Sequence, residues 1–141
     1  MSTIEFVKDE IQEALAVDAF KAYRLKQGVI CKKCGSKRHY WLANKQQFQC
    51  VSCRFRTTLR SGSVLEGTKL PYSYFFMSIH LLIKHGYKLT TEDFQNFTGH
   101  KYFGPIWHYL RNIKATLKEE ERVVIYQEFV ERAKQYLDNK N

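Results

Sequence analysis

The chain has 141 residues and carries 23 lysine and arginine residues against 14 acidic ones, a formal net charge of +9. This length allows one domain or two very small ones, and a hydrophobic content of 44% excludes wholesale disorder. The sequence shows neither an apolar run of the ~20 residues that cross a bilayer nor a secretory signal, so we expect a cytoplasmic protein with reduced cysteines and no membrane partner.

The positive charge is concentrated in the middle of the chain. Residues 31–70 carry a net charge of +8 and residues 71–115 a net charge of +3, whereas residues 1–30 and 116–141 each carry −1. A basic centre of this density predicts a polyanionic partner, either a nucleic acid or an acidic membrane surface. The alternative is a generically high isoelectric point without such a partner.

The first expected element is an N-terminal helical segment within residues 1–28. Residues 4–27 are rich in good helix formers, and Gly28 ends the segment. Apolar side chains recur along it at helical spacing: Phe6, Ile11, Leu15, Phe20 and Tyr23.

A segment of short strands follows over residues 29–60, where aromatic and β-branched residues alternate with polar ones. We expect strands at residues 40–42, 47–49 and 55–58. Residues 61–68 contain clustered turn residues and are expected to form a connection.

Residues 61–116 are expected to contain a bundle of three short helices. The first starts at Pro71, which suits a first helical turn, and ends near His85. The second is capped by Thr90 or Thr91 and ends at Gly99.

The third helix of this bundle begins within residues 101–105 and runs to about Lys114. Its apolar side chains are expected to face inward: Phe103, Ile106, Trp107, Leu110 and Ile113. A C-terminal amphipathic helix follows within residues 117–141, and its apolar face is expected to cap the bundle or to support a homodimer. The members of that face are Val123, Tyr126, Phe129, Val130 and Ala133.

All four cysteines belong to two C-x2-C pairs: Cys31 with Cys34 and, after fifteen intervening residues, Cys50 with Cys53. A C-x2-C turn directs two thiolates at one ion, and two such turns supply the four sulfur ligands that suit tetrahedral Zn²⁺. Because no coordination position is left open, we expect one structural zinc ion that stabilises the segment. Rubredoxin-like iron, two redox-active dithiol pairs and unrelated free thiols are the alternatives.

The histidines are not expected to bind metal. His39 lies between the two cysteine pairs, but four cysteines already complete a site. His80 and His85 fall on an apolar helix and are expected at the edge of the core, whereas His108 is available to a phosphate or a base. No arrangement of residues supports a catalytic nucleophile, so neither a catalytic residue nor a small-molecule substrate is predicted.

The second and third helices of the bundle, joined by a short turn at Gly99-His100, have the pattern of a helix-turn-helix. In that motif the second helix enters the major groove and its N-terminal residues contact base edges. We therefore predict double-stranded DNA as the partner; an ordinary amphipathic bundle with a solvated polar face is the alternative. The predicted contacts on this helix are Lys101, Tyr102, His108, Arg111 and Asn112.

The segment around the cysteines is a second predicted DNA contact, because its basic side chains are interleaved with aromatic ones. The basic residues predicted to touch DNA are Lys32, Lys37, Arg38, Lys45, Arg54, Arg56 and Arg60. Some of the neighbouring aromatic side chains must form the small core of this segment.

Several short motifs of the chain resemble one known family. They include Cys-Lys-Lys-Cys-Gly-Ser at 31–36, Phe-Gln-Cys-Val-Ser-Cys-Arg at 48–54, Gly-Thr-Lys-Leu-Pro at 67–71 and Pro-Ile-Trp at 105–107. The resemblance, over about residues 18–114, is to the N-terminal region of insertion-sequence transposases that begin with a zinc ribbon. In that family a zinc ribbon and a helix-turn-helix precede a DDE-type catalytic domain, which implies binding to the terminal inverted repeats of a mobile element.

The expected fold is mostly α with a small β zinc ribbon, followed by a three-helix helix-turn-helix bundle and a C-terminal helix. After residue 116 we find only a charged amphipathic helix, and its Glu119-Glu120-Glu121 run is not the carboxylate triad of a DDE domain. We therefore expect a nucleoid-associated DNA-binding protein that is not an enzyme. The alternatives are a minimal nuclease, a subunit of a split transposase, and an adaptor or inhibitor that pairs with a full-length transposase.

Overall fold

The computed structural model describes residues 13–140, except for the side chains of Tyr87 and of residues 136–140. Its elements are α1 (Glu13–Gln27), β1 (His39–Leu42), β2 (Gln47–Cys50), β3 (Arg56–Thr58), α2 (Ser73–His85), the 3₁₀ turn η3 (Gly86–Lys88), α3 (Thr91–Thr98), α4 (Phe103–Thr116) and α5 (Glu119–Lys140). The fold is mostly helical with one small sheet, as expected from the sequence. The part of the predicted N-terminal helix over residues 4–12 lies outside the described residues.

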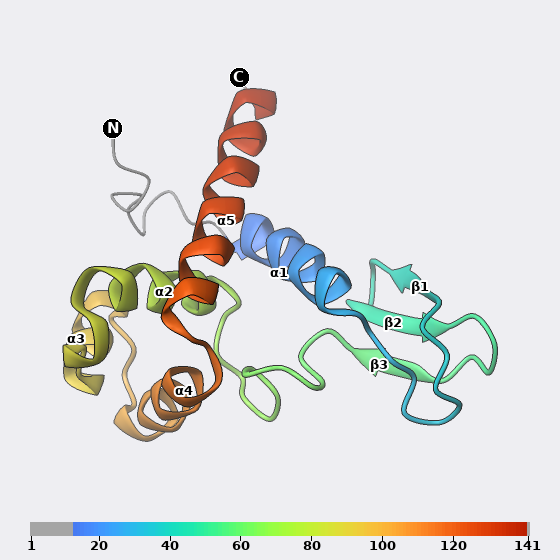
Figure 1. The fold of residues 1–141 in the computed structure, drawn as a ribbon, viewed down its shortest axis with the longest axis horizontal. Coiled ribbons are helices and arrows are strands. Elements are labelled where there is room, and N and C mark those ends of the chain that lie inside the picture. The colour runs from blue at the N-terminus through green and yellow to red at the C-terminus, as the bar shows by residue number, and fades with distance from the viewer. Residues whose placement is uncertain (1–12, 141) are drawn as a thin grey trace.

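The sheet and the helical bundle lie at opposite ends of the molecule, and α1 connects them (Figure 1). Helices α2, α3 and α4 form the bundle end, and α5 packs across both α1 and α2. Among the described helices, none has the length and apolar character that crossing a bilayer requires.

The three strands form an antiparallel sheet in the order β1-β2-β3. His39 pairs with Cys50 at one end of the first hairpin, and Gln47 pairs with Thr58 across the second. The strands agree with the expected positions to within one residue. One side of the sheet has a small core, in which Phe48 is buried and Trp41 packs against it with ring centroids 5.0 Å apart.

An aromatic core joins the helices that come from distant parts of the chain. Phe20 of α1 meets Phe75 of α2 edge to face at 5.0 Å, and Phe76 of α2 stacks on Phe129 of α5 at 4.1 Å. The C-terminal helix therefore caps the bundle, which is one of the two arrangements expected from the sequence. Of its expected apolar face, Val123 is exposed, and the buried members are Tyr126, Phe129, Val130 and Ala133.

The structure corrects the expected inward face of α4. Ile106, Leu110 and Ile113 are buried as predicted, but Phe103 and Trp107 are exposed, and Tyr109 is buried in their place. Trp107 lies one position after Ile106 and so about 100° further round the helix. Tyr109 can be buried because its hydroxyl group lies 2.7 Å from the Ser78 hydroxyl of α2, which removes the cost of an unpaired polar group.

Helix α3 begins and ends at the expected residues. Thr90 and Asp93 form a capping box, in which the Thr90 hydroxyl accepts from the Asp93 N–H at 3.0 Å and the Asp93 carboxylate accepts from the Thr90 N–H at 3.2 Å. These hydrogen bonds with Thr90 lower the pKa of the Asp93 carboxyl group. Gly99 ends the helix in the left-handed conformation, with φ at 73°.

Helix α2 begins two residues later than expected, and its N-terminus is capped from another helix. Pro71 lies before the helix, which starts at Ser73. The carboxylate of Glu13, the first residue of α1, accepts hydrogen bonds from the backbone N–H groups of Tyr72 at 2.7 Å and Ser73 at 3.0 Å. The side chain thus satisfies two N–H groups that lack intrahelical partners and places a negative charge at the positive end of the helix dipole.

Replacing Glu13 by alanine should therefore lower the free energy of unfolding by ~1–2 kcal/mol, the range for loss of a helix N-cap. Urea unfolding followed by circular dichroism measures the effect. Glu131→Ala is the matched control, because Glu131 is an exposed acid on α5. An equal loss in the two variants would contradict the capping role.

Candidate metal centre and nucleic-acid interface

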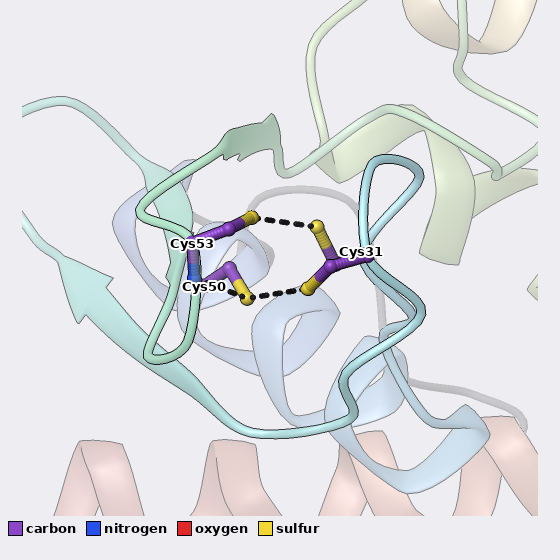
Figure 2. A group of neighbouring side chains, drawn as sticks. Cys31, Cys50 and Cys53 are labelled. Carbon is purple, nitrogen blue, oxygen red and sulfur yellow. Dashed lines mark hydrogen bonds between the residues drawn. The ribbon is translucent and has the colours of Figure 1, made fainter.

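The four cysteine side chains converge at one end of the sheet. Cys31 and Cys34 come from the loop before β1, Cys50 is the last residue of β2, and Cys53 lies in the following turn. The sulfur atoms of Cys31 and Cys53 are 3.5 Å apart, as are those of Cys34 and Cys50, and all four lie within 4.8 Å of one another. Figure 2 shows the sulfurs of Cys50 and Cys53 facing Cys31 across the space between the two loops.

The two cysteine loops have the same backbone design. In the first, the Gly35 N–H donates to the Cys31 carbonyl at 2.9 Å, and in the second the Arg54 N–H donates to the Cys50 carbonyl at 2.9 Å. The residue after the second cysteine has a positive φ in both, 78° at Gly35 and 68° at Arg54. Glycine adopts this conformation freely, whereas an arginine does so only where the surrounding structure enforces it.

The spacing of the sulfurs fits a single tetrahedral ion. A disulfide would require about 2.05 Å between sulfurs, so the four thiols are free. Tetrahedral zinc with Zn–S bonds of about 2.3 Å separates its sulfur ligands by about 3.8 Å, close to the distances found here. The cluster can therefore bind one metal ion, consistent with a structural Zn²⁺ held by four cysteines with no open position.

The electrostatics of the cluster also favour a cation. The Cys53 N–H lowers the pKa of the Cys50 thiol to about 6. The Ser36 N–H acts to lower the pKa of Cys34, but the hydrogen bonds that this thiol shares with Cys50 and Cys53 outweigh it and raise the pKa to about 12. Four thiolates this close repel one another, and a divalent ion removes that repulsion.

The family comparison agrees with this geometry. Residues 11–56 match the transposase zinc-ribbon domain of the IS1595 type. The matched segment covers about a third of the chain and contains α1, both cysteine loops and the first two strands of the zinc ribbon. Neither the curated proteins nor the solved structures contain a match to the chain.

His39 does not join the zinc ribbon's metal cluster, which among the described residues consists of the four cysteines. Its ring lies beside Phe48 at a centroid distance of 6.3 Å. His80 is buried against Tyr126 at 5.4 Å, and this burial lowers the pKa of its imidazole, whereas His85 is exposed. The expected place at the edge of the core is thus confirmed for His80 and wrong for His85.

The basic residues that the sequence predicts as DNA contacts of the zinc ribbon are exposed with one exception. The exposed members are Lys32, Lys37, Arg38, Lys45, Arg54 and Arg56. Lys32 lies 3.7 Å from the Glu66 carboxylate, but a surface ion pair of this kind contributes little and leaves the ammonium group accessible.

The exception is Arg60, which binds within the protein. Its guanidinium group lies 4.2 Å from the centre of the Tyr72 ring and donates to the Thr68 carbonyl and hydroxyl oxygens at 3.2 Å. The buried Arg24 of α1 likewise donates to the Ser61 carbonyl at 2.7 Å. These two side chains tie the segment after β3 to α1 and to the start of α2. No local pattern in the sequence predicted either contact, because the partners come from different elements.

The residues predicted as DNA contacts of the third bundle helix are all exposed. Lys101 and Tyr102 lie just before α4, and His108, Arg111 and Asn112 lie on it. Tyr102, His108 and Asn112 line a groove with a volume of about 860 Å³, which is also lined by Val64 and residues 66–70, including Glu66 and Lys69. Arg111 lies 5.3 Å from the Trp107 ring, and Lys101 lies 5.9 Å from the Tyr102 ring. The exposure of Phe103 and Trp107, which adjoin these cations, was not predicted from the sequence.

We expect the purified protein to contain one zinc ion per chain, and Cys50→Ser to lose both the ion and the folded ribbon, because the short strands have little core of their own. Metal analysis and amide NMR spectra measure these two properties. Ser52→Ala, a change in the same loop that keeps all four sulfurs, should retain both. A ribbon that stays folded without metal, or iron in place of zinc, would contradict this prediction.

Arg60→Ala should lower the free energy of unfolding by ~1–3 kcal/mol, because the partly buried Thr68 oxygens lose their donor and the Tyr72 ring loses its cation. Urea unfolding of the zinc-loaded protein tests this expectation. The control is Arg56→Ala, since Arg56 is exposed on β3 and should contribute little to stability. Equal stability of the Arg60→Ala variant and the unaltered chain would rule out the intramolecular role.

Proposed function

We propose that this chain is a zinc-dependent protein that binds double-stranded DNA at sites resembling the terminal inverted repeats of a mobile element. The observation that carries the proposal is the match of residues 11–56 to the transposase zinc-ribbon domain. The charge supports it, because residues 31–70 carry a net charge of +8. A surface of this charge attracts the phosphate backbone of DNA.

In this proposal the zinc ribbon contacts the DNA backbone. Its exposed cations lie on the cysteine loops and on the sheet, and Tyr40 and Phe55 are exposed among them. Lysine and arginine side chains neutralise phosphates without reading sequence, and exposed aromatic side chains add apolar contacts. The ribbon would therefore contribute more to the affinity for DNA than to the recognition of its sequence.

Helices α3 and α4 would form the helix-turn-helix, and α4 would enter the major groove. Residues 99–102 connect the two helices, and Phe94 of α3 packs near Tyr109 of α4 with ring centroids 6.2 Å apart. This packing occupies one face of α4 and leaves His108 and Arg111 exposed on the other, with Lys101 exposed in the connection before the helix. The sequence has no acidic residue between Asp93 and Glu119, so α4 presents no charge that repels DNA.

The proposal assigns binding, and not catalysis of strand transfer, to this chain. The first turn of α5 carries three exposed acidic residues, Glu119, Glu120 and Glu121. Their negative charge interacts favourably with the positive end of the helix dipole. Glu121 accepts a hydrogen bond from the Lys118 N–H at 3.3 Å, a local role at the helix start. We also propose that the chain forms a homodimer or binds a full-length transposase. Its proposed location is the nucleoid.

DNA affinity should fall steeply with salt, by ~10³-fold or more between 50 and 200 mM if about six phosphates are contacted. Lys101→Ala and Lys37→Ala should each weaken binding and reduce the slope of log affinity against log salt by about one. Fluorescence anisotropy with a duplex selected from a random pool measures both quantities. Lys134→Ala on α5, an exposed lysine outside the basic centre, should leave the slope unchanged.

Two results would overturn this function. Clean Mg²⁺-dependent nicking of terminal-repeat DNA by the purified chain would make it an enzyme. Capture of a full-length transposase by a chain that shows no DNA affinity at moderate salt would make it an adaptor.

A further inference from the structure

Exposed aromatic side chains gather at the start of α4. Of the described aromatic residues, those exposed to solvent are Tyr40, Phe55, Tyr102, Phe103 and Trp107. Tyr102, Phe103 and Trp107 have exposed fractions of 62%, 53% and 39%. All five lie in residues 31–115, the stretch that carries a net charge of +11.

Because these aromatic side chains are exposed, the fold does not gain the free energy that their burial in the core would contribute. Phe103 and Trp107 stand one turn apart on the same side of α4, next to the buried face formed by Ile106, Leu110 and Ile113. Burial of one large aromatic side chain is strongly favourable, and single exposed apolar residues are common. A group of three within one and a half turns of helix instead marks a contact surface.

The charges beside this surface indicate which macromolecule it contacts. Arg111 lies over the Trp107 ring and Lys101 over the Tyr102 ring, at 5.3 and 5.9 Å. Such cation–π contacts hold the guanidinium and ammonium groups against the aromatic faces. The chain has no acidic residue between Asp93 and Glu119, so α4 itself adds no negative charge beside these aromatic and cationic groups, which complement the major groove of DNA.

The major groove offers one apolar group, the C5-methyl group of thymine, and guanine presents two acceptors to an arginine. We propose that Phe103 and Trp107 recognise thymine through this methyl group, and that Arg111, held beside Trp107, recognises an adjacent guanine. This inference rests on the proposed entry of α4 into the major groove. It assigns the sequence preference to two aromatic residues and one cation on the outer side of α4.

Replacing thymine by uracil tests the methyl contact without altering base pairing. The probe is the duplex that the unaltered protein selects from a random pool, with each thymine replaced in turn by uracil. At the contacted positions the unaltered protein should lose about fourfold in affinity per methyl group, which corresponds to about 0.8 kcal/mol. Phe103→Ala and Trp107→Ala should bind the thymine and uracil duplexes equally at those positions.

Val124→Ala provides the matched control, because Val124 is an exposed apolar residue on α5 and should keep the full preference for thymine. Arg111→Ala should lose the preference for guanine beside the thymine. Zinc content and circular dichroism show whether each variant is folded, and the uracil series on the unaltered protein does not depend on any variant.

The outcomes separate this inference from the function on which it rests. A protein that selects no duplex overturns both. A protein that binds its selected duplex but ignores every thymine-to-uracil change leaves DNA binding standing and overturns the thymine contact. The contact is also wrong if Trp107→Ala keeps the preference for thymine, or if it weakens binding to single-stranded oligonucleotides more than to the duplex, which would indicate stacking on unpaired bases.

Discussion

The convergence of four cysteine sulfurs is the constraint on which the zinc-ribbon half of the structure depends. The strands are three or four residues long, and the buried aromatic core of the sheet is centred on Phe48. Strands this short do not hold together by their own packing. A structural zinc ion contributes on the order of 10–16 kcal/mol of apparent binding free energy, which exceeds the net stability of many small domains. The shape of the basic surface thus follows from the metal.

The junction between the zinc ribbon and the bundle depends on charged side chains used inside the protein. Arg24 and Arg60 bind carbonyl oxygens of the connecting segment, and Glu13 caps α2 from α1. Because each contact joins residues of different elements, the connection after β3 is held at several points along its length. The two basic surfaces, on the ribbon and on α4, are thereby kept at a defined separation, as the proposed contact with DNA at two places requires.

Local signals in the sequence predicted much of this architecture. The cysteine spacing, the three strands, the Thr90 cap and the Gly99 stop each depend on residues within a few positions of one another. The failures concern contacts across the fold. Tyr109 is buried with its hydroxyl group hydrogen-bonded to the Ser78 hydroxyl of another helix. The buried face of α4 therefore includes Tyr109, and Trp107 lies outside it. In the sequence, nothing distinguishes Arg60 from an exposed cation. Its position beside the Tyr72 ring in the structure shows that it binds within the protein.

The left-handed backbone at Arg54 sets stability against charge in the second cysteine loop. The first cysteine loop has glycine at the equivalent position, so glycine would suit the second loop and relieve the strain of order 1 kcal/mol that an arginine bears there. That substitution would also remove a cation from the proposed DNA surface. Under the proposed function, backbone strain therefore favours glycine at this position, whereas attraction to DNA favours arginine.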